Sequence, residues 1–354
     1  MKSKLYIVVA LLVVASFLAA CAPKAAATTA PAADAPAVEK KLRVVHLVNG
    51  QLGDKSFTDS AHRGLVDAEK DFGIELKTYE VGLDPAKWVP ALVDTAEDPE
   101  VDVIVMGSGD LLDALYEQAV KHPEKKFIMF DNPVDFTDKC KACTNVYAVQ
   151  YKQNEGSFMV GLYAGLMSQS KKIGAVGGKE IPVILDFMIG YKQGAVLAGL
   201  KEEDVLIQYI GSWNDPAKAK EIALAMYQQG ADYVFQVAGG SGPGVFQAAI
   251  EAGKWALGVD SDQAVLYEET NPDYTKVIAT SMLKNVDKSL YRAFKMISEG
   301  TFKWGINEAL GIPDGAGLAY NKYYEALTPQ AVKDQIAKVE ADVIAGKIVV
   351  ATVY

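Results

Sequence analysis

The sequence predicts an α/β protein of two lobes, each built on a parallel sheet flanked by helices. Residues 209–263 alternate between strand-like and helix-like patterns, and residues 79–133 repeat that alternation at a nearly constant offset. About 310 residues follow the small-residue start of the chain, which is enough for two such lobes.

Residues 209–263 read as strand, helix, strand, helix and strand. Residues 217–229 and 245–252 carry apolar side chains at helical spacing, and residues 233–238 and 256–259 are short apolar runs rich in β-forming residues. This alternation indicates parallel strands joined by crossover helices, and ligands of such sheets bind at the carboxyl ends of the strands. Three segments fall at those ends: residues 212–214, 239–242 and 260–262.

The earlier stretch is a twin of this one. The tetrapeptide Asp-Pro-Ala-Lys at residues 84–87 recurs at 215–218, and Asp131 matches Asp260, with an offset of 129 to 131 residues throughout. All α/β units look alike in general, but an identical tetrapeptide and a steady offset favour true internal symmetry. Two similar lobes can present their strand ends to each other across a cleft.

The chain begins with the features of a secretory signal, because lysines precede a short apolar run over residues 5–17. That run is too short to span a bilayer as a permanent helix. Residues 18–21 read LAAC and resemble the lipobox of bacterial lipoproteins. The resemblance predicts a signal peptide over residues 1–20 and lipidation of Cys21. The alternative is an ordinary signal peptide with an incidental cysteine.

Residues 21–40 are rich in Ala, Pro and Thr and predict a flexible tether. Together these features place the protein on the extracytoplasmic face of the cell membrane, held by its lipid. Without the two signal lysines, 33 basic residues stand against 45 acidic ones, a net charge of −12. This balance argues against nucleic acid as a partner and against electrostatic adhesion to a membrane.

The two remaining cysteines, Cys140 and Cys143, lie in a polar loop after the strand that ends at Asp131. Outside the cytoplasm such a pair favours a local disulfide. A zinc half-site would need a second pair of ligands nearby, and a redox-active pair would stand at a helix start.

The first lobe begins with a buried strand over residues 42–48, and a helix follows from about residue 61 to 72. The loop between them contains Phe57, for which few core partners are available. We expect Phe57 to contact a ligand, and the alternative is that it anchors the loop.

The second lobe begins near residues 148–154, with a helix over 155–167, a strand over 172–177 and a helix over 190–200. We expect a first lobe of residues 42–150 with about 285–310, and a second lobe of residues 151–284 with about 311–354. A two-lobed fold of this type commonly crosses between the lobes more than once, and we expect Lys284 at the second crossing, where a side chain can face the cleft. The alternative is a solvated lysine at a helix start.

An ordered set of segments now identifies a family. The set comprises the lipobox, residues 54–57 and 60–61, 154–158, 212–218, 238–244 and 258–263, and Thr280 and Ser281 with Lys284. Together they resemble the basic membrane protein family, also called PnrA-like lipoproteins, over nearly all of residues 42–320. The resemblance implies a two-lobed periplasmic-binding-protein-like fold of type I and a substrate-binding role for an ABC importer. Characterised members bind nucleosides.

The resemblance also implies how a flat base is held. Phe57 and Trp213 sandwich the base, where an aromatic pair contributes about 0.5–1.5 kcal/mol beyond burial. Most relatives have phenylalanine where Trp213 stands. Asp131 resembles the carboxylate that reads the base, accepting from its N–H groups.

Asp260 and Lys284 resemble the pair that binds the ribose, with Asp260 accepting from hydroxyl groups and Lys284 donating to them. Gly239 resembles the position where the backbone approaches the sugar, which requires the absence of a Cβ. Asp262 competes with Asp260 for the site. Because the internal repeat matches Asp131 to Asp260, we place Asp260 in the site and leave Asp262 as a loop or cap residue.

Other chemistries are disfavoured. Residues 240–244 have the wrong spacing for a dinucleotide fingerprint, and residues 174–180 are one residue short of a phosphate loop. His46, His62 and His122 show no ligand spacing, so neither a metal site nor histidine-based catalysis is expected. We expect no cofactor and no catalytic residue.

Three functions remain open. The first is a monomeric, lipid-tethered module that captures a nucleoside, with a purine base favoured, and delivers it to an ABC permease. The second is the same module with another small ligand, such as a free base, a sugar or a signal molecule. The third is a nucleoside-processing enzyme, for which Asp131 and Asp260 are the only candidate acid–base pair.

Overall fold

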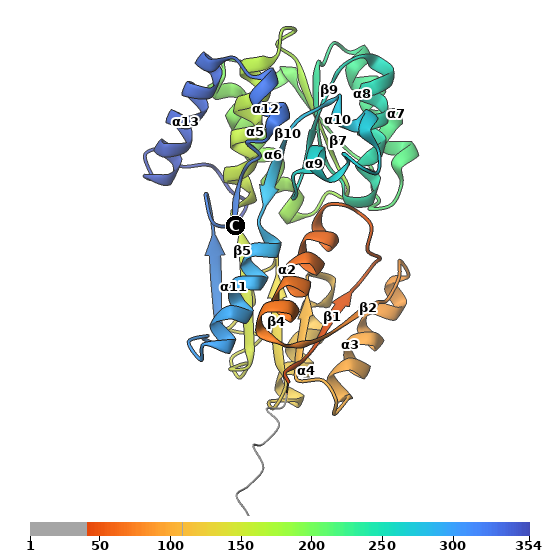
Figure 1. Ribbon diagram of the computed structural model, residues 1–354, viewed down its shortest axis with the longest axis vertical. Coiled ribbons are helices and arrows are strands. Elements are labelled where there is room, and N and C mark those ends of the chain that lie inside the picture. The colour runs from red at the N-terminus through yellow and green to blue at the C-terminus, as the bar shows by residue number, and fades with distance from the viewer. Residues whose placement is uncertain (1–40, 108) are drawn as a thin grey trace, which may run out of the picture. The chain divides into compact units, whose positions relative to one another are not determined.

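The structure, a computed structural model, describes residues 41–107 and 109–354, and residues 41–354 form one compact unit. The signal peptide expected over residues 1–20, the lipidated Cys21 and the tether up to residue 40 lie outside the described residues. Two six-stranded sheets, each covered by helices, carry the fold (Figure 1). This confirms the two-lobed α/β fold expected from the sequence.

The first sheet has the strand order β11-β5-β4-β3-β1-β2. Its neighbouring strands pair in parallel throughout, and its central strands are buried apolar runs, as expected for a sheet covered on both faces. Its strands are β1 (Arg43–Val48), β2 (Glu75–Glu80), β3 (Val103–Met106), β4 (Lys126–Phe130), β5 (Val146–Tyr151) and β11 (Ile306–Leu310).

The second sheet repeats this order as β12-β10-β9-β8-β6-β7. It differs at one edge, where β12 pairs with β10 in the antiparallel sense, whereas β11 is parallel to β5. Its strands are β6 (Ile173–Gly177), β7 (Val205–Tyr209), β8 (Tyr233–Val237), β9 (Trp255–Gly258), β10 (Ile278–Lys284) and β12 (Ala316–Leu318).

Helices cover both sheets, and one helix joins the first lobe from late in the sequence. Helix α11 lies beside α2 in Figure 1, and Tyr291 of α11 donates a hydrogen bond to Asp71 of α2. The helices of the first lobe are α2 (Phe57–Phe72), α3 (Trp88–Glu97), α4 (Leu112–Lys121) and α11 (Val286–Ser298). Those of the second are α5 (Gln153–Met167), α6 (Pro182–Leu197), α7 (Pro216–Gln228), α8 (Pro243–Ala252), α9 (Gln263–Leu266), α10 (Pro272–Thr275), α12 (Lys322–Leu327) and α13 (Gln330–Ile344).

In the described part of the chain, three connections pass between the sheets: β5 to α5, β10 to α11 and β11 to β12. We call them the crossings. Hydrogen bonds tie them to one another, so they behave as one junction. The ties are Lys152 N to Leu310 O at 2.8 Å, Ile312 N to Glu155 Oε2 at 3.0 Å, and Asn285 Nδ2 to Pro313 O at 3.1 Å.

Helix α6 begins at Pro182, eight residues before the start at residue 190 expected from the sequence, so that expectation was wrong. Gly190 lies inside α6, at a place where α5 passes very close to it. A Cβ on Gly190 would overlap the backbone carbonyl of Asn154, and a Cβ on Gly161 of α5 would overlap that of Tyr191. These glycines therefore serve a close helix–helix approach.

Helix α2 likewise begins earlier than expected, at Phe57 rather than near residue 61. The side chain of Asp54 accepts hydrogen bonds from the backbone N–H groups of Thr58 at 2.9 Å and Asp59 at 3.1 Å. It thereby satisfies donors that the first turn of a helix leaves unpaired. This capping places Phe57 on the helix itself rather than in the loop before it.

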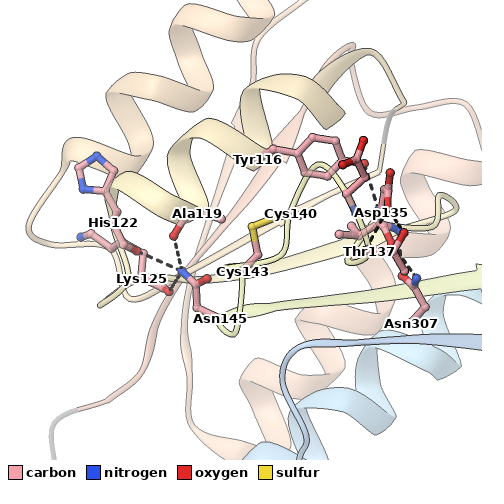
Figure 2. The surroundings of a disulfide bond; sticks show 12 residues. Tyr116, Ala119, His122, Lys125, Asp135, Thr137, Cys140, Cys143, Asn145 and Asn307 are labelled. Atoms are coloured by element: carbon pink, nitrogen blue, oxygen red, sulfur yellow. Dashed lines mark hydrogen bonds between the residues drawn. A yellow bond between two sulfur atoms is a disulfide. The ribbon is translucent and has the colours of Figure 1, made fainter.

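The structure joins Cys140 and Cys143 by a disulfide in the loop that follows β4 (Figure 2). Both cysteines are fully buried in the core of the first lobe, although the sequence around them is polar. Asn145 anchors the end of this loop through hydrogen bonds to the carbonyls of Ala119 and Lys125, both at 3.0 Å. The loop is thus fixed at both ends, and it begins at Asp131.

Candidate ligand-binding site

Two aspartates with unusual backbone geometry mark the strand ends that face each other. Asp131 directly follows β4 and has φ of 70°, while Asp260 lies two residues after β9 and has φ of 63°. Positive φ is uncommon for residues other than glycine, although aspartate tolerates it better than most. Such backbone strain concentrates at functional sites, so this shared conformation directs attention to the pair.

Lys284, the last residue of β10, is buried with 2% of its surface exposed and lies between the two aspartates. Its Nζ donates a hydrogen bond of 2.5 Å to Asp131 Oδ1, and Asp131 itself is 7% exposed. The solvated lysine considered from the sequence is therefore excluded. A buried ammonium beside a buried carboxylate is a charge-assisted hydrogen bond, the strong kind.

Aromatic rings surround the Lys284 ammonium on its other sides. The centroid of the Phe187 ring lies 4.8 Å from Nζ, that of Phe57 lies 5.4 Å away, and that of Tyr151 lies 5.7 Å away. Each is within the range of a cation–π interaction, which strengthens in a desolvated site. These rings form a cage around the ammonium, which uses one of its three N–H donors on Asp131.

Burial and the nearby ammonium act in opposite directions on the pKa values of the two aspartates. Burial raises the pKa of Asp131, while the ammonium of Lys284 and its hydrogen bond act to lower it. Asp260 is 8% exposed, and burial raises its pKa to about 6 although Lys284 and the Ser56 hydroxyl oppose the shift. Asp131 is therefore paired with a cation, whereas the hydrogen bond of Asp260 comes from a hydroxyl group.

Asp260 receives its hydrogen bond from the opposite lobe. Ser56 Oγ, at the start of α2, donates to Asp260 Oδ2 at 2.5 Å. The same loops meet again where Ser261 Oγ donates to Ser56 O at 3.4 Å and Arg63 Nη2 donates to Ser261 Oγ at 2.8 Å. The strand ends of the two lobes are therefore in direct contact on this side of the site.

The expected stacking residues lie on different lobes and differ in their surroundings. Phe57 packs on Phe130, with ring centroids 5.2 Å apart, so it also anchors the start of α2. Trp213 packs over Gly178, where a Cβ would overlap its ring. Gly239 adopts φ of 54°, and a Cβ there would lie 3.9 Å from the Trp213 ring. The two aromatic rings are not in contact with each other.

Asp262 has a different task from Asp260. Its carboxylate caps α9 by accepting from Val265 N and also accepts from Asn321 Nδ2 at 2.6 Å. This is the cap role expected from the sequence. Its side chain is therefore committed to the fold of the second lobe.

The chain matches the family model described as "ABC transporter substrate-binding protein PnrA-like" over residues 41–352. It belongs to this family. Among curated relatives, the ABC transporter nucleoside-binding protein BmpA of Lactococcus lactis is 30% identical over 325 residues, covering 88% of each chain. An uncharacterised lipoprotein of Pyrococcus horikoshii is 32% identical over 333 residues, covering 90% of this chain and 77% of its own.

Solved structures of solute-binding proteins agree with the fold. A solute-binding protein of an ABC transporter system from Aeropyrum pernix superposes with a TM-score of 0.77 at 25% identity, covering 88% of this chain and 94% of its own. A second, from Conexibacter woesei, has a TM-score of 0.70 at 20% identity, covering 88% and 99%, and supports the fold alone.

Several residues at the site were not singled out from the sequence: Ser56, Tyr151 and Phe187. Ser56 stands directly before Phe57 in a segment that the family resemblance includes, so its position was a usable signal. Tyr151 and Phe187 read as ordinary core residues at strand and helix spacing. Nothing in their local sequence separates them from the rest of the core.

Two further properties bear on function. Among residues 41–107 and 109–354, no group of three or more His, Cys, Asp or Glu side chains is placed to hold a metal ion. Over the same residues, no helix has both the length and the apolar character needed to cross a bilayer. What the site offers is a donor between two acceptors, with aromatic rings around it.

Proposed function

We propose that this substrate-binding protein captures a purine nucleoside between its two lobes and delivers it to an ABC permease outside the cytoplasm. The observation that carries the proposal is the buried arrangement of Asp131, Lys284 and Asp260 at facing strand ends. It combines a fixed donor with acceptors on both sides, beside an aromatic ring on each lobe.

A nucleoside matches this arrangement group by group. A ribose hydroxyl donates to Asp260 and accepts from Lys284, whose ammonium has three donors and uses one on Asp131. Asp131 accepts from an N–H group of the base, and Phe57 and Trp213 provide apolar faces for its rings. A ligand that lacked these donors would leave buried carboxylates unmatched, which costs affinity.

The relatives support the same ligand class. The Lactococcus lactis relative is named as a nucleoside-binding protein, and it aligns over nearly all of the part that forms the two lobes. Lipidation of Cys21 follows from the lipobox and agrees with the lipoprotein name of the Pyrococcus relative. Replacing Cys21 by serine should move the protein from the membrane fraction to the soluble fraction.

In this proposal the protein acts as a monomer and does not alter its ligand chemically. The two lobes close on the ligand by rotation at the crossings, with residues 42–150 and about 285–310 moving against the remainder. A ligand that touches both lobes binds the closed state better, so it shifts the population towards closure.

Titration calorimetry with inosine, guanosine, hypoxanthine, ribose and maltose tests the proposal. We expect binding of the nucleosides, much weaker binding of the free base and of ribose, and none of maltose. Incubation with inosine should release no hypoxanthine, whereas its release would indicate an enzyme. Binding of a sugar with no binding of any nucleoside would contradict the proposed ligand.

A further inference from the structure

The last five described residues, 350–354, form an extended segment on the second lobe that we call the strap. The strap belongs to no helix or strand, and its residues are largely exposed apart from Val350. In Figure 1 the C-terminal end lies at the level of the junction between the lobes. The bonds that hold the strap are Asn154 Nδ2 to Val350 O and Ala351 O, Ala351 N to Gln193 Oε1, and Thr352 Oγ1 and Val353 N to Asp186 Oδ1.

Asp186 of α6 is the point on which the strap is fixed. It is 1% exposed, and within the described part of the chain it forms no salt bridge. Three hydrogen bonds satisfy its carboxylate: Gln153 Nε2 at 2.8 Å, Thr352 Oγ1 at 2.6 Å and Val353 N at 3.1 Å. A buried carboxylate without a cation depends on such donors, and the strap supplies two of the three.

This carboxylate connects the strap to the candidate ligand-binding site in two ways. Gln153 is the first residue of α5, at the crossing that follows β5. Phe187 is the neighbour of Asp186 on α6, and its ring is the one closest to the Lys284 ammonium, at 4.8 Å. Any shift of Asp186 therefore moves both the crossing that follows β5 and the Phe187 ring beside the Lys284 ammonium.

The last residue of the strap is held through the same threonine that binds Asp186. Tyr354 N is held in turn by Thr352 Oγ1 at 3.2 Å, the hydroxyl that donates to Asp186. One threonine hydroxyl thus links the end of the strap to the buried carboxylate.

We propose that the strap is a positioning element of the ligand-binding site. Fixed on Asp186, it holds Phe187 against the Lys284 ammonium and holds Gln153 at the crossing that follows β5. The inference rests on the proposed function, because it assigns the strap to the nucleoside site. Thr352 is the positioning residue in this scheme, and Asp186 transmits its effect.

The test compares Thr352→Val, which removes the hydroxyl, with Thr352→Ser, which keeps it. Val349→Ala serves as a further control, since Val349 lies beside the strap and is 79% exposed. We expect inosine affinity to fall about tenfold in Thr352→Val, as for the loss of a hydrogen bond to a charged group. Thr352→Ser and Val349→Ala should bind like the unaltered protein.

A measurement without ligand separates this inference from the proposed function. Amide hydrogen exchange of residues 153–158 and 281–285 should be faster in Thr352→Val than in Thr352→Ser. If the unaltered protein binds no nucleoside, the proposed function fails, and the exchange comparison still decides whether the strap holds the crossings. Equal exchange in the two variants, or equal inosine affinity where nucleosides bind, would overturn the proposal.

Discussion

The two lobes share a backbone plan but provide different chemistry at their strand ends. Their five main strands follow the same order, and each lobe places an aspartate with positive φ at the matching strand end, Asp131 or Asp260. The partners of these aspartates differ. Asp131 is bonded to the Lys284 ammonium, whereas Asp260 accepts from the Ser56 hydroxyl of the opposite lobe.

The last residues of β5 and β10 show where this difference originates. These strands occupy matching places in the two sheets, but β5 ends at Tyr151 and β10 ends at Lys284. The Tyr151 hydroxyl is bonded to Ser289 at 2.5 Å, and its ring contacts the ammonium of its counterpart. Of these two matching strands, only β10 therefore ends in a cation. Because of this asymmetry, a ligand with two unlike ends can bind in one orientation.

The aromatic residues depart from the symmetry altogether. Phe57 follows β1, the counterpart of β6, whereas Trp213 follows β7, the counterpart of β2. At the repeat offset, the first-lobe counterpart of Trp213 is Gly82. The internal repeat therefore supplies matching aspartates, and the proposed base sandwich draws on unrelated positions of the two lobes.

The largest expected effect comes from removing the Lys284 ammonium, which distinguishes the end of β10 from the end of β5. Lys284→Met should lower the free energy of unfolding by about 3–5 kcal/mol, because it leaves Asp131 buried without its partner. Tyr151→Phe, at the matching position, should cost about 1 kcal/mol for a lost hydrogen bond. Denaturant unfolding measures both. Similar costs for the two variants would show that the lobes do not differ in the way described, and adding Asp131→Asn to Lys284→Met should recover much of the loss.

The next largest effect concerns Trp213, which has no aromatic counterpart in the first lobe. Trp213→Ala should weaken inosine binding by about 1–3 kcal/mol through the loss of stacking. Trp213→Phe should retain most of the affinity, since a smaller ring still stacks. Trp304→Ala serves as a control, because Trp304 packs on Phe302 in the first lobe. Unchanged calorimetric affinity in Trp213→Ala would rule out the sandwich.

The pH dependence distinguishes the two aspartates. In the proposed complex the carboxylate of Asp260 accepts from the ligand. Because burial raises its pKa to about 6, protonation should weaken inosine binding about tenfold from pH 7 to pH 5. Stability without ligand should run the other way. A raised carboxyl pKa contributes stability that is present below the unfolded value and is lost as pH rises through about 6, by up to about 3 kcal/mol. Asp260→Asn should flatten both profiles, and profiles that keep their midpoint would assign the titration elsewhere.

The smallest expected effect concerns the hydrogen bond between Ser56 and Asp260, which joins the two lobes. Ser56→Ala removes the hydroxyl that donates to Asp260 and should cost about 1 kcal/mol of affinity or stability. Because that hydrogen bond lowers the pKa of Asp260, the midpoint of the binding–pH profile should move upward. Ser298→Ala, which removes an exposed hydroxyl of α11, is the control. A midpoint that stays in place would mean that Ser56 does not act on Asp260.

Most of the fold could be predicted from the sequence because strand and helix patterns are local. The expected strand over residues 233–238 and helix over 217–229 agree with β8 and α7 to within one residue. Errors arose where a long-range contact changes the meaning of a residue. Gly190 marks a close approach of α5 to α6 rather than a boundary, and Asp54 starts α2 early through its side chain.

The positions of Asp131 and Asp260 could be predicted because a strand end is visible in the sequence and the repeat matches the two. Their partners could not be predicted from spacing. Lys284 is 153 residues from Asp131, and Ser56 is 204 residues from Asp260. Which side chains meet at such distances depends on how the lobes pack, and neither propensity nor periodicity carries that information.

A crystal structure with inosine would show whether the two lobes bind one nucleoside between Asp131 and Asp260. We expect the base between Phe57 and Trp213, with an N–H group at hydrogen-bond distance from Asp131. We also expect ribose hydroxyls within about 3.2 Å of Asp260 and Lys284. Inosine bound away from these three side chains, or held by one lobe alone, would show that the two aspartates do not form the binding site.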